Sequence, residues 1–375
     1  MESVKRNRSV PFFNYPHVFI SQEDAFLSII KDVGRRGAFI MQKDLADFEK
    51  NLADYTGARF AVGVGNATDA LQIGLMAGGI GPGDEVIFCS HTMVATAAAI
   101  HFAGAVSVPV EAGADHLIDP ESIESAVNGR TKAILPTQLN GRTADMDIIK
   151  AIADKHGLEI YEDAAQALGS RFKGKCAGTF GKASCISFYP AKVVGCLGDG
   201  GAVLTNDEDV YQKVLSLRDH GRDEHGGVIM WGLNSRLDNI QAALLDFQLK
   251  NYQSVIDRRR AIARLYKERL GCLEQLRLPP GPDSDPDHFD VFQNYEIEAE
   301  SRDELQVYLK DRGVGTLIQW GGKAVHQFKE LGFTQSLPFT ERLFERMLMI
   351  PMNMSLSDED MNYVCDCIID FYTSR

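Results

Sequence analysis

Short apolar segments alternate with helical patterns between residues 58 and 205. The segments predicted to be strands are 58–64, 84–89, 105–110, 131–137, 158–163, 183–188 and 201–205. The segments predicted to be helices begin near Thr68 or span 94–104, 119–127 and 145–157. Apolar strands that alternate with helices indicate a mainly parallel sheet covered on both faces. Ligands of such sheets bind at the carboxyl ends of the strands.

The pattern changes after residue 235. Two long helices are predicted within 235–270, and the Pro- and Asp-rich segment 278–288 predicts a loop. The segments 292–299, 302–313 and 357–373 predict a strand and two helices of a small α+β domain. A chain of 375 residues exceeds the ~250–300 residues at which one core stops growing. We therefore expect residues 1–250 to form an N-terminal segment with a large α/β domain, and residues 251–375 to form a small α+β domain.

Composition narrows the class of protein. The formal net charge of −13 argues against non-specific binding of nucleic acid. No signal peptide and no apolar run long enough to cross a membrane is evident, so we expect a soluble cytoplasmic protein without a membrane partner. Seven cysteines without a CxxC pair predict reduced thiols and no metal site.

A single lysine, Lys192, lies between two of the predicted strands. Glycines follow it at 195, 198, 200 and 201, and they allow the backbone to pass close to a bound ring or phosphate. A lysine in a loop often only extends into water. In a partly dry place, however, burial lowers the pKa of the amine, and a neutral amine can form a Schiff base.

A Schiff-base lysine that uses pyridoxal phosphate needs a carboxylate beside the ring nitrogen and a site for the phosphate. Asp163 ends the strand 158–163, although it could also be a solvated turn residue. The segment 62–75 runs from a strand into a helix and places the backbone of Ala67 and Thr68 at the positive end of the helix dipole. Its Gly-x-Gly lacks the third glycine of a dinucleotide fingerprint, so an NAD-dependent oxidoreductase is a weak alternative.

The sequence resembles the DegT/DnrJ/EryC1/StrS family of sugar aminotransferases, which are pyridoxal-phosphate enzymes of fold type I. The resemblance spans most of the chain and is carried by residues 37–71, 161–170, 187–207, 217–222, 232–245 and 337–361. It implies a large domain with a seven-stranded, mainly parallel sheet between helices and a small C-terminal α+β domain.

The resemblance also implies roles at matching positions. Lys192 matches the Schiff-base lysine that moves the proton, and Asp163 matches the carboxylate at the ring nitrogen. The other matching cofactor contacts are Gln166 at the ring hydroxyl and Ala67, Thr68 and Ser187 at the phosphate. Asn234 matches a residue that reaches the phosphate of the neighbouring subunit, which implies a homodimer with shared active sites.

Three segments depart from the family pattern. Met93 stands where an aromatic residue usually stacks on the cofactor, and a methionine can pack on a ring through its sulfur. The segment 138–141 has Gln138 and Asn140 where the family has histidine and tyrosine. The segment 319–326 contains Gln319, Trp320 and Lys323. We predict that these residues of the last two segments, Gln138, Asn140, Gln319, Trp320 and Lys323, contact the substrate and that the substrate is unusual. Trp320 could equally belong to the core of the small domain.

The implied reaction has two halves. Glutamate donates its amino group to the cofactor, leaving 2-oxoglutarate and pyridoxamine phosphate, and the amino group then passes to a keto-sugar. The family implies a nucleotide-linked keto-deoxysugar from polysaccharide or antibiotic pathways. Alternatives are a keto-sugar acid or sugar phosphate as acceptor, and a non-catalytic regulatory protein that binds the cofactor. Lys192 disfavours the dehydratase branch of the family, which has histidine at this position.

Overall fold

A seven-stranded sheet forms the centre of the computed structural model, which describes residues 8–374. The strand order is β1-β9-β8-β5-β4-β2-β3, and only β9 runs antiparallel to its neighbours. The strands are β1 (Phe60–Val64), β2 (Glu85–Cys89), β3 (Val106–Val110), β4 (Thr131–Leu135), β5 (Glu159–Asp163), β8 (Ala183–Ser187) and β9 (Gly201–Thr205). The predicted sheet is therefore confirmed.

Alternating side chains of the strands enter separate cores on the two faces of the sheet. Val86 and Phe88 belong to the core beneath α4, α5 and α8, whereas Ile87 and Cys89 belong to the core beneath α6 and α7. Helices α3 and α9 cover the rest of the second face. The helices of this domain are α3 (Lys43–Thr56), α4 (Ala67–Ala77), α5 (Val94–Phe102), α6 (Pro120–Ala126), α7 (Met146–His156), α8 (Glu208–Arg218) and α9 (Asn239–Lys250).

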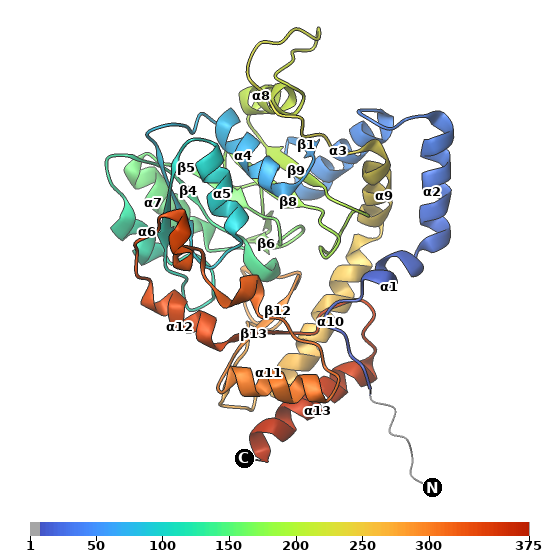
Figure 1. The fold of residues 1–375 in the computed structure, drawn as a ribbon, viewed down its shortest axis with the longest axis vertical. Helices are drawn as coiled ribbons and strands as arrows, with labels where there is room; N and C mark the ends of the chain where they lie inside the picture. The colour runs from blue at the N-terminus through green and yellow to red at the C-terminus, as the bar shows by residue number, and fades with distance from the viewer. Residues whose placement is uncertain (1–7, 375) are drawn as a thin grey trace.

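The C-terminal part builds a second, smaller sheet with the order β10-β12-β13. It lies below the large sheet in Figure 1, beside α10, α11 and α13. Its elements are α10 (Tyr252–Leu270), β10 (Leu276–Arg277), β12 (Tyr295–Ala299), α11 (Arg302–Asp311), α12 (Pro338–Arg346), β13 (Met347–Ile350) and α13 (Asp358–Thr373). Val10 also packs in this core and pairs with Val314, so the N-terminal segment reaches the C-terminal part. The domain boundary at residue 250 stays a prediction.

Shorter elements connect these parts. They are α1 (Tyr15–Ile20), α2 (Glu23–Arg36), a sheet of β6 (Arg171–Phe172), β7 (Lys175–Cys176) and β11 (His288–Phe289), and the 3-10 turns η1 (Leu139–Gly141), η2 (Gln319–Gly322), η3 (Val325–Gln327) and η4 (Lys329–Leu331). The strand predicted from residue 292 begins only at Tyr295, since Phe292 has a left-handed φ of 52°. Such a φ lies outside the β region.

Strand β9 starts directly against the first turn of α4. A Cβ atom at Gly201 would lie 2.4 Å from the backbone carbon of Asn66, so only glycine fits here without a shift. Asn66 caps α4 by accepting a hydrogen bond from the backbone N–H of Asp69. The glycine therefore sets the position of the α4 N-terminus relative to the sheet.

Replacing Gly201 by alanine should push α4 away from β9 and destabilise the protein by about 1–3 kcal/mol, as overpacking does. Urea unfolding of Gly201→Ala and wild type measures the effect. Gly81→Ala is the matched control, because a Cβ there meets nothing within 4 Å. Equal effects of the two substitutions would contradict the close approach.

Candidate active site

One cavity of about 380 Å³ opens where the carboxyl ends of the central strands meet the start of α4. Cavities of this size are typical of small-molecule sites. Residues predicted to bind a cofactor line it from six places in the sequence. They are Ala67, Thr68, Met93, Asp163, Gln166, Ser187 and Lys192. The fold thus brings Ala67 and Lys192 to one cavity although they are far apart along the chain.

Asp163 is the last residue of β5 and is 5% exposed. One carboxylate oxygen accepts a hydrogen bond from Thr96 Oγ1 at 2.7 Å. The other accepts from the backbone N–H of Ala165 at 3.2 Å and from Cys185 Sγ at 3.3 Å. Burial, together with Asp163, raises the pKa of the Cys185 thiol, so it stays a donor. These donors fix the orientation of the Asp163 carboxylate at the cavity.

Glu162, the preceding residue, faces away from this cavity. Its carboxylate accepts hydrogen bonds from the backbone N–H groups of Gly178, Phe180 and Gly181. Burial raises the pKa of Glu162 despite these donors. The alternation of side chains along β5 therefore leaves Asp163 as the acid at the cavity.

Lys192 follows β8 and lines the same cavity as Asp163. Burial lowers the pKa of its amine, while the Asp163 carboxylate opposes the shift. The direction agrees with the expectation from the sequence. A lower pKa increases the share of neutral amine, which is the form that reacts with an aldehyde.

The first turn of α4 supplies the anion side of the cavity. Ser235 Oγ accepts from the backbone N–H of Gly65 at 3.0 Å and donates to Asp69 at 2.6 Å, so the turn is held rigidly. Ala67 and Thr68 line the cavity at the helix N-terminus, where backbone N–H groups and the helix dipole favour a phosphate.

The groups around this cavity fit pyridoxal phosphate. The amine suits its aldehyde, the fixed carboxylate suits its ring nitrogen, and the helix N-terminus suits its phosphate. When bound, this cofactor supplies an electron sink for the carbon that loses or gains an amino group. Lys192, Asp163 and the start of α4 are the groups that would hold it.

The five predicted substrate contacts differ in how they lie relative to the cavity. Trp320 lines the cavity and also packs against Phe344, with the ring centroids 6.2 Å apart. Asn140 and Gln319 lie beside the cavity and are bonded to each other at 3.0 Å. Lys323 is exposed and lies outside the cavity.

Gln138 does not reach the cavity. It is fully buried, its Nε2 donates to Glu162 at 2.8 Å and its Oε1 accepts from the backbone N–H of Ala144 at 2.7 Å. Its amide is therefore used within the protein, and the geometry gives it a structural place instead of the predicted direct contact. Asn234 is exposed and also lies outside the cavity of its own chain.

Sequence reasoning missed the residues that support Asp163. Thr96 bonds the carboxylate, and Thr92 bonds Thr96 and Thr137 at 2.8 and 3.0 Å. The only signal in the sequence was a threonine in the first turn of the predicted helix 94–104. Tyr189 and Asp199, near Lys192 in sequence, also line the cavity.

Residues 21–369 match the model of the DegT/DnrJ/EryC1/StrS aminotransferase family. The chain belongs to this family. The family is one of pyridoxal-phosphate aminotransferases of fold type I, in agreement with the site and the sheet.

Curated relatives and solved structures cover nearly the whole chain. A "pleiotropic regulatory protein" of Geobacillus stearothermophilus is 37% identical over 97% of this chain and 99% of its own length. A dTDP-3-amino-3,4,6-trideoxy-alpha-D-glucose transaminase of Streptomyces venezuelae is 38% identical over 98% of this chain and 97% of its own.

Two crystal structures are similar to the present fold. S. venezuelae DesV has a TM-score of 0.93 at 37% identity and covers 97% of this chain and 98% of its own. NtdA of Bacillus subtilis, with bound PMP, has a TM-score of 0.89 at 29% identity over 97% of this chain and 86% of its own.

Two negative observations complete the description of this family member. Within residues 8–374, no group of three or more His, Cys, Asp or Glu side chains is placed to hold a metal ion. No helix in the same range is both long enough and apolar enough to span a bilayer.

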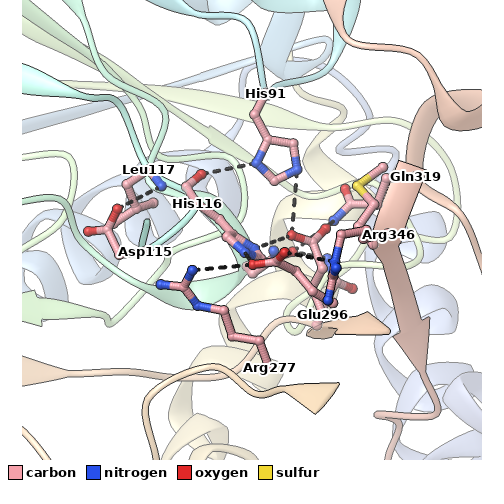
Figure 2. Close-up of polar contacts among 12 residues, drawn as sticks. His91, Asp115, His116, Leu117, Arg277, Glu296, Gln319 and Arg346 are labelled. Carbon is pink, nitrogen blue, oxygen red and sulfur yellow. Dashed lines mark hydrogen bonds and ion pairs between the residues drawn. The ribbon is translucent and has the colours of Figure 1, made fainter. Parts of the chain in front are cut away.

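A cluster of buried charges joins the two sheets next to the cavity (Figure 2). His116 Nδ1 lies 2.8 Å from Glu296 Oε1, and its Nε2 lies 3.2 Å from Glu298 Oε1. Both ring nitrogens therefore face carboxylates of β12, which favours the imidazolium. Burial alone would lower the pKa of His116, but Glu296 and Glu298 raise it to about 9.

The charged form of His116 should stabilise the fold at neutral pH. A pKa of about 9 in the folded state, against ~6.5 unfolded, gives about 3 kcal/mol below pH 6.5 that is lost as the pH rises through 9. The titratable or charged groups around His116 are His91, Glu296, Glu298, Arg277 and Arg346.

The variant His116→Asn tests this, because asparagine tolerates the left-handed φ of 68° at this position. Urea unfolding at pH 6, 7.5 and 10 should show a difference from wild type that is large at pH 6 and small at pH 10. A difference that does not change with pH would contradict a charged His116.

Proposed function

We propose that this family member transfers the amino group of glutamate, by way of pyridoxal phosphate, to a nucleotide-linked keto-deoxysugar. The observation that carries the proposal is the single cavity that joins Lys192, Asp163 and the start of α4. The dTDP-sugar transaminase of S. venezuelae, similar over almost the entire chain, supports a sugar bound to a nucleotide.

In this proposal each side chain has a defined task. Lys192 would bond the cofactor and, as a free amine, would move the proton at the reacting carbon. Asp163 faces the ring nitrogen and keeps it protonated. Ala67 and Thr68, with Ser187, hold the phosphate. Met93, which is 47% exposed at the start of α5, packs on the ring through its sulfur.

The substrate is proposed to reach Asn140, Gln319 and Trp320. These residues depart from the family pattern, so a keto-sugar acid or a sugar phosphate is the runner-up acceptor. The assay is the release of 2-oxoglutarate from glutamate in the presence of each acceptor. Activity with dTDP- or UDP-keto-sugars would support a nucleotide-linked acceptor, and activity with keto-sugar acids or keto-sugar phosphates would support the runner-up. Turnover with no member of any set would overturn the proposed reaction.

A regulatory role is the second candidate, because the relative from Geobacillus stearothermophilus is named a regulatory protein. A protein with that role alone would bind the cofactor without releasing 2-oxoglutarate. Lys192 and Asp163 on one cavity favour turnover, since binding alone does not need a reactive amine.

The proposed enzyme is a cytoplasmic homodimer with shared active sites that serves polysaccharide or antibiotic sugar pathways. The loop after α8 projects from the body of the protein at the top of Figure 1. Trp231 in this loop is 95% exposed and Val228 is 71% exposed. Apolar side chains so exposed are typical of a protein interface. The exposed Asn234 of the same loop would reach the partner's phosphate site.

Lys192→Ala should fold like wild type but lose at least about 10³-fold in turnover, because no other amine is expected to take its place. The near-visible absorbance band that shifts on addition of glutamate should disappear as well. Lys132→Ala is the control, since Lys132 is exposed on β4 and far from the cavity lining. Undiminished amination by Lys192→Ala would refute the assignment.

Shared active sites can be tested by mixing two inactive variants. Lys192→Ala and Asn234→Asp, unfolded and refolded together, should regain up to about a quarter of the wild-type activity, because half of the dimers are hybrids with one intact site. Each variant refolded alone should stay nearly inactive. A mixture without added activity, although it forms hybrid dimers, would show that Asn234 serves its own chain.

A further inference from the structure

Glu296 is buried in β12 beside the active site, and the proposed reaction gives it no role. Its Oε2 accepts a hydrogen bond from Gln319 Nε2 at 2.7 Å, and its Oε1 bonds His116. His91 Nδ1 donates to the backbone carbonyl of His116, and His91 Nε2 lies 3.5 Å from Glu296, as Figure 2 shows. Burial would raise the pKa of Glu296, but His91 and His116 hold it well below its ordinary value.

An ionised carboxylate only accepts hydrogen bonds, so Glu296 fixes which end of the Gln319 amide faces it. The second hydrogen of Gln319 Nε2 goes to Asn140 Oδ1 at 3.0 Å. Asn140 Oδ1 also accepts from Asn294 Nδ2 at 2.9 Å, and Asn294 Nδ2 donates in turn to Gln166 Oε1 at 3.3 Å. The directions of the Gln319, Asn140 and Asn294 amides therefore follow from the charge of Glu296.

Gln166 Oε1 has two donors, and only the second of them belongs to the side-chain series. The backbone N–H of Asn140 donates to Gln166 Oε1 at 2.9 Å, and the side chain of Asn140 holds Asn294, the other donor. Because Gln166 Oε1 is occupied twice, its NH₂ group is left to donate into the cavity that it shares with Lys192.

The backbone around this series is strained. His116, Asn140, Phe292 and Trp320 have φ values of 68°, 56°, 52° and 49°, in the left-handed region that non-glycine residues rarely adopt. Each such residue costs free energy and persists only where its surroundings hold it, most often at functional sites. The strain is an independent observation that this arrangement serves the active site.

We propose that Glu296 is a positioning residue whose buried charge, relayed through Gln319, Asn140 and Asn294, holds the second donor on Gln166 Oε1 and so strengthens the hydrogen bond from the Gln166 NH₂ group to the ring oxygen of the cofactor. The inference rests on the proposed function. A donor stabilises negative charge on that oxygen, so the chromophore formed with Lys192 holds its proton less tightly. Glu296 thereby lowers the pH at which the absorbance of the bound cofactor titrates.

The test is a pH titration of the visible absorbance of the purified holoenzyme. Glu296→Gln removes the charge and the fixed direction of the series, and it should raise the apparent pKa of the absorbance by up to about half a unit, the cooperative part of a hydrogen bond worth about one to two units. Gln166→Ala removes the donor itself and should raise it by at least about one unit. Glu298→Gln is the matched control, because Glu298 also bonds His116 on the same strand but does not contact Gln319.

If Glu296→Gln does not fold, Gln319→Leu interrupts the series at the next residue, keeps the contact of Glu296 with His116, and should give the same upward shift. The inference would be overturned if Glu296→Gln or Gln319→Leu titrated at the same pH as wild type. It would also be overturned if Glu298→Gln gave an equal shift, because the loss of any nearby negative charge would then explain the effect. A wild-type protein that binds pyridoxal phosphate without this absorbance band would overturn the proposed function instead.

Discussion

The hydrogen-bonded carboxylate of Asp163 is the interaction on which the rest of the site depends. A buried acid needs donors, and Thr96, Cys185 and the backbone of Ala165 supply them from three different elements. These donors hold the carboxylate at the cavity, where it opposes the burial that lowers the pKa of Lys192. In the proposed enzyme the same group would orient the cofactor ring and tune the amine that bonds it.

The sheet explains why these groups meet. Strands β4, β5 and β8 are parallel and end at one edge, so the residues that follow them converge there. Strand β9 runs in the opposite direction and brings Gly201 against Asn66 at the start of α4. The anion site and the lysine therefore line one small cavity.

Much of this arrangement could be predicted from the sequence because its signals are local. The apolar segment 201–205 coincides with β9, Asp145 and Gly157 flank α7, and Lys192 stands between two buried strands. Contacts between distant segments gave no such signal. Glu296 lies 180 residues after His116, and Gln138 is bonded to Glu162 through packing that no periodicity reveals. Hence the residues expected to contact the cofactor could be predicted from the sequence, whereas the hydrogen-bonded polar residues around them could not.

In the proposed enzyme the amine of Lys192 bonds the aldehyde of pyridoxal phosphate while Asp163 faces the ring nitrogen. Borohydride reduction of the holoenzyme, followed by mass spectrometry of its peptides, tests this most directly, since reduction turns the Schiff base into a stable secondary amine. We expect a pyridoxyl group on the peptide that contains Lys192. A pyridoxyl group on another lysine, or none on a protein saturated with the cofactor, would contradict it.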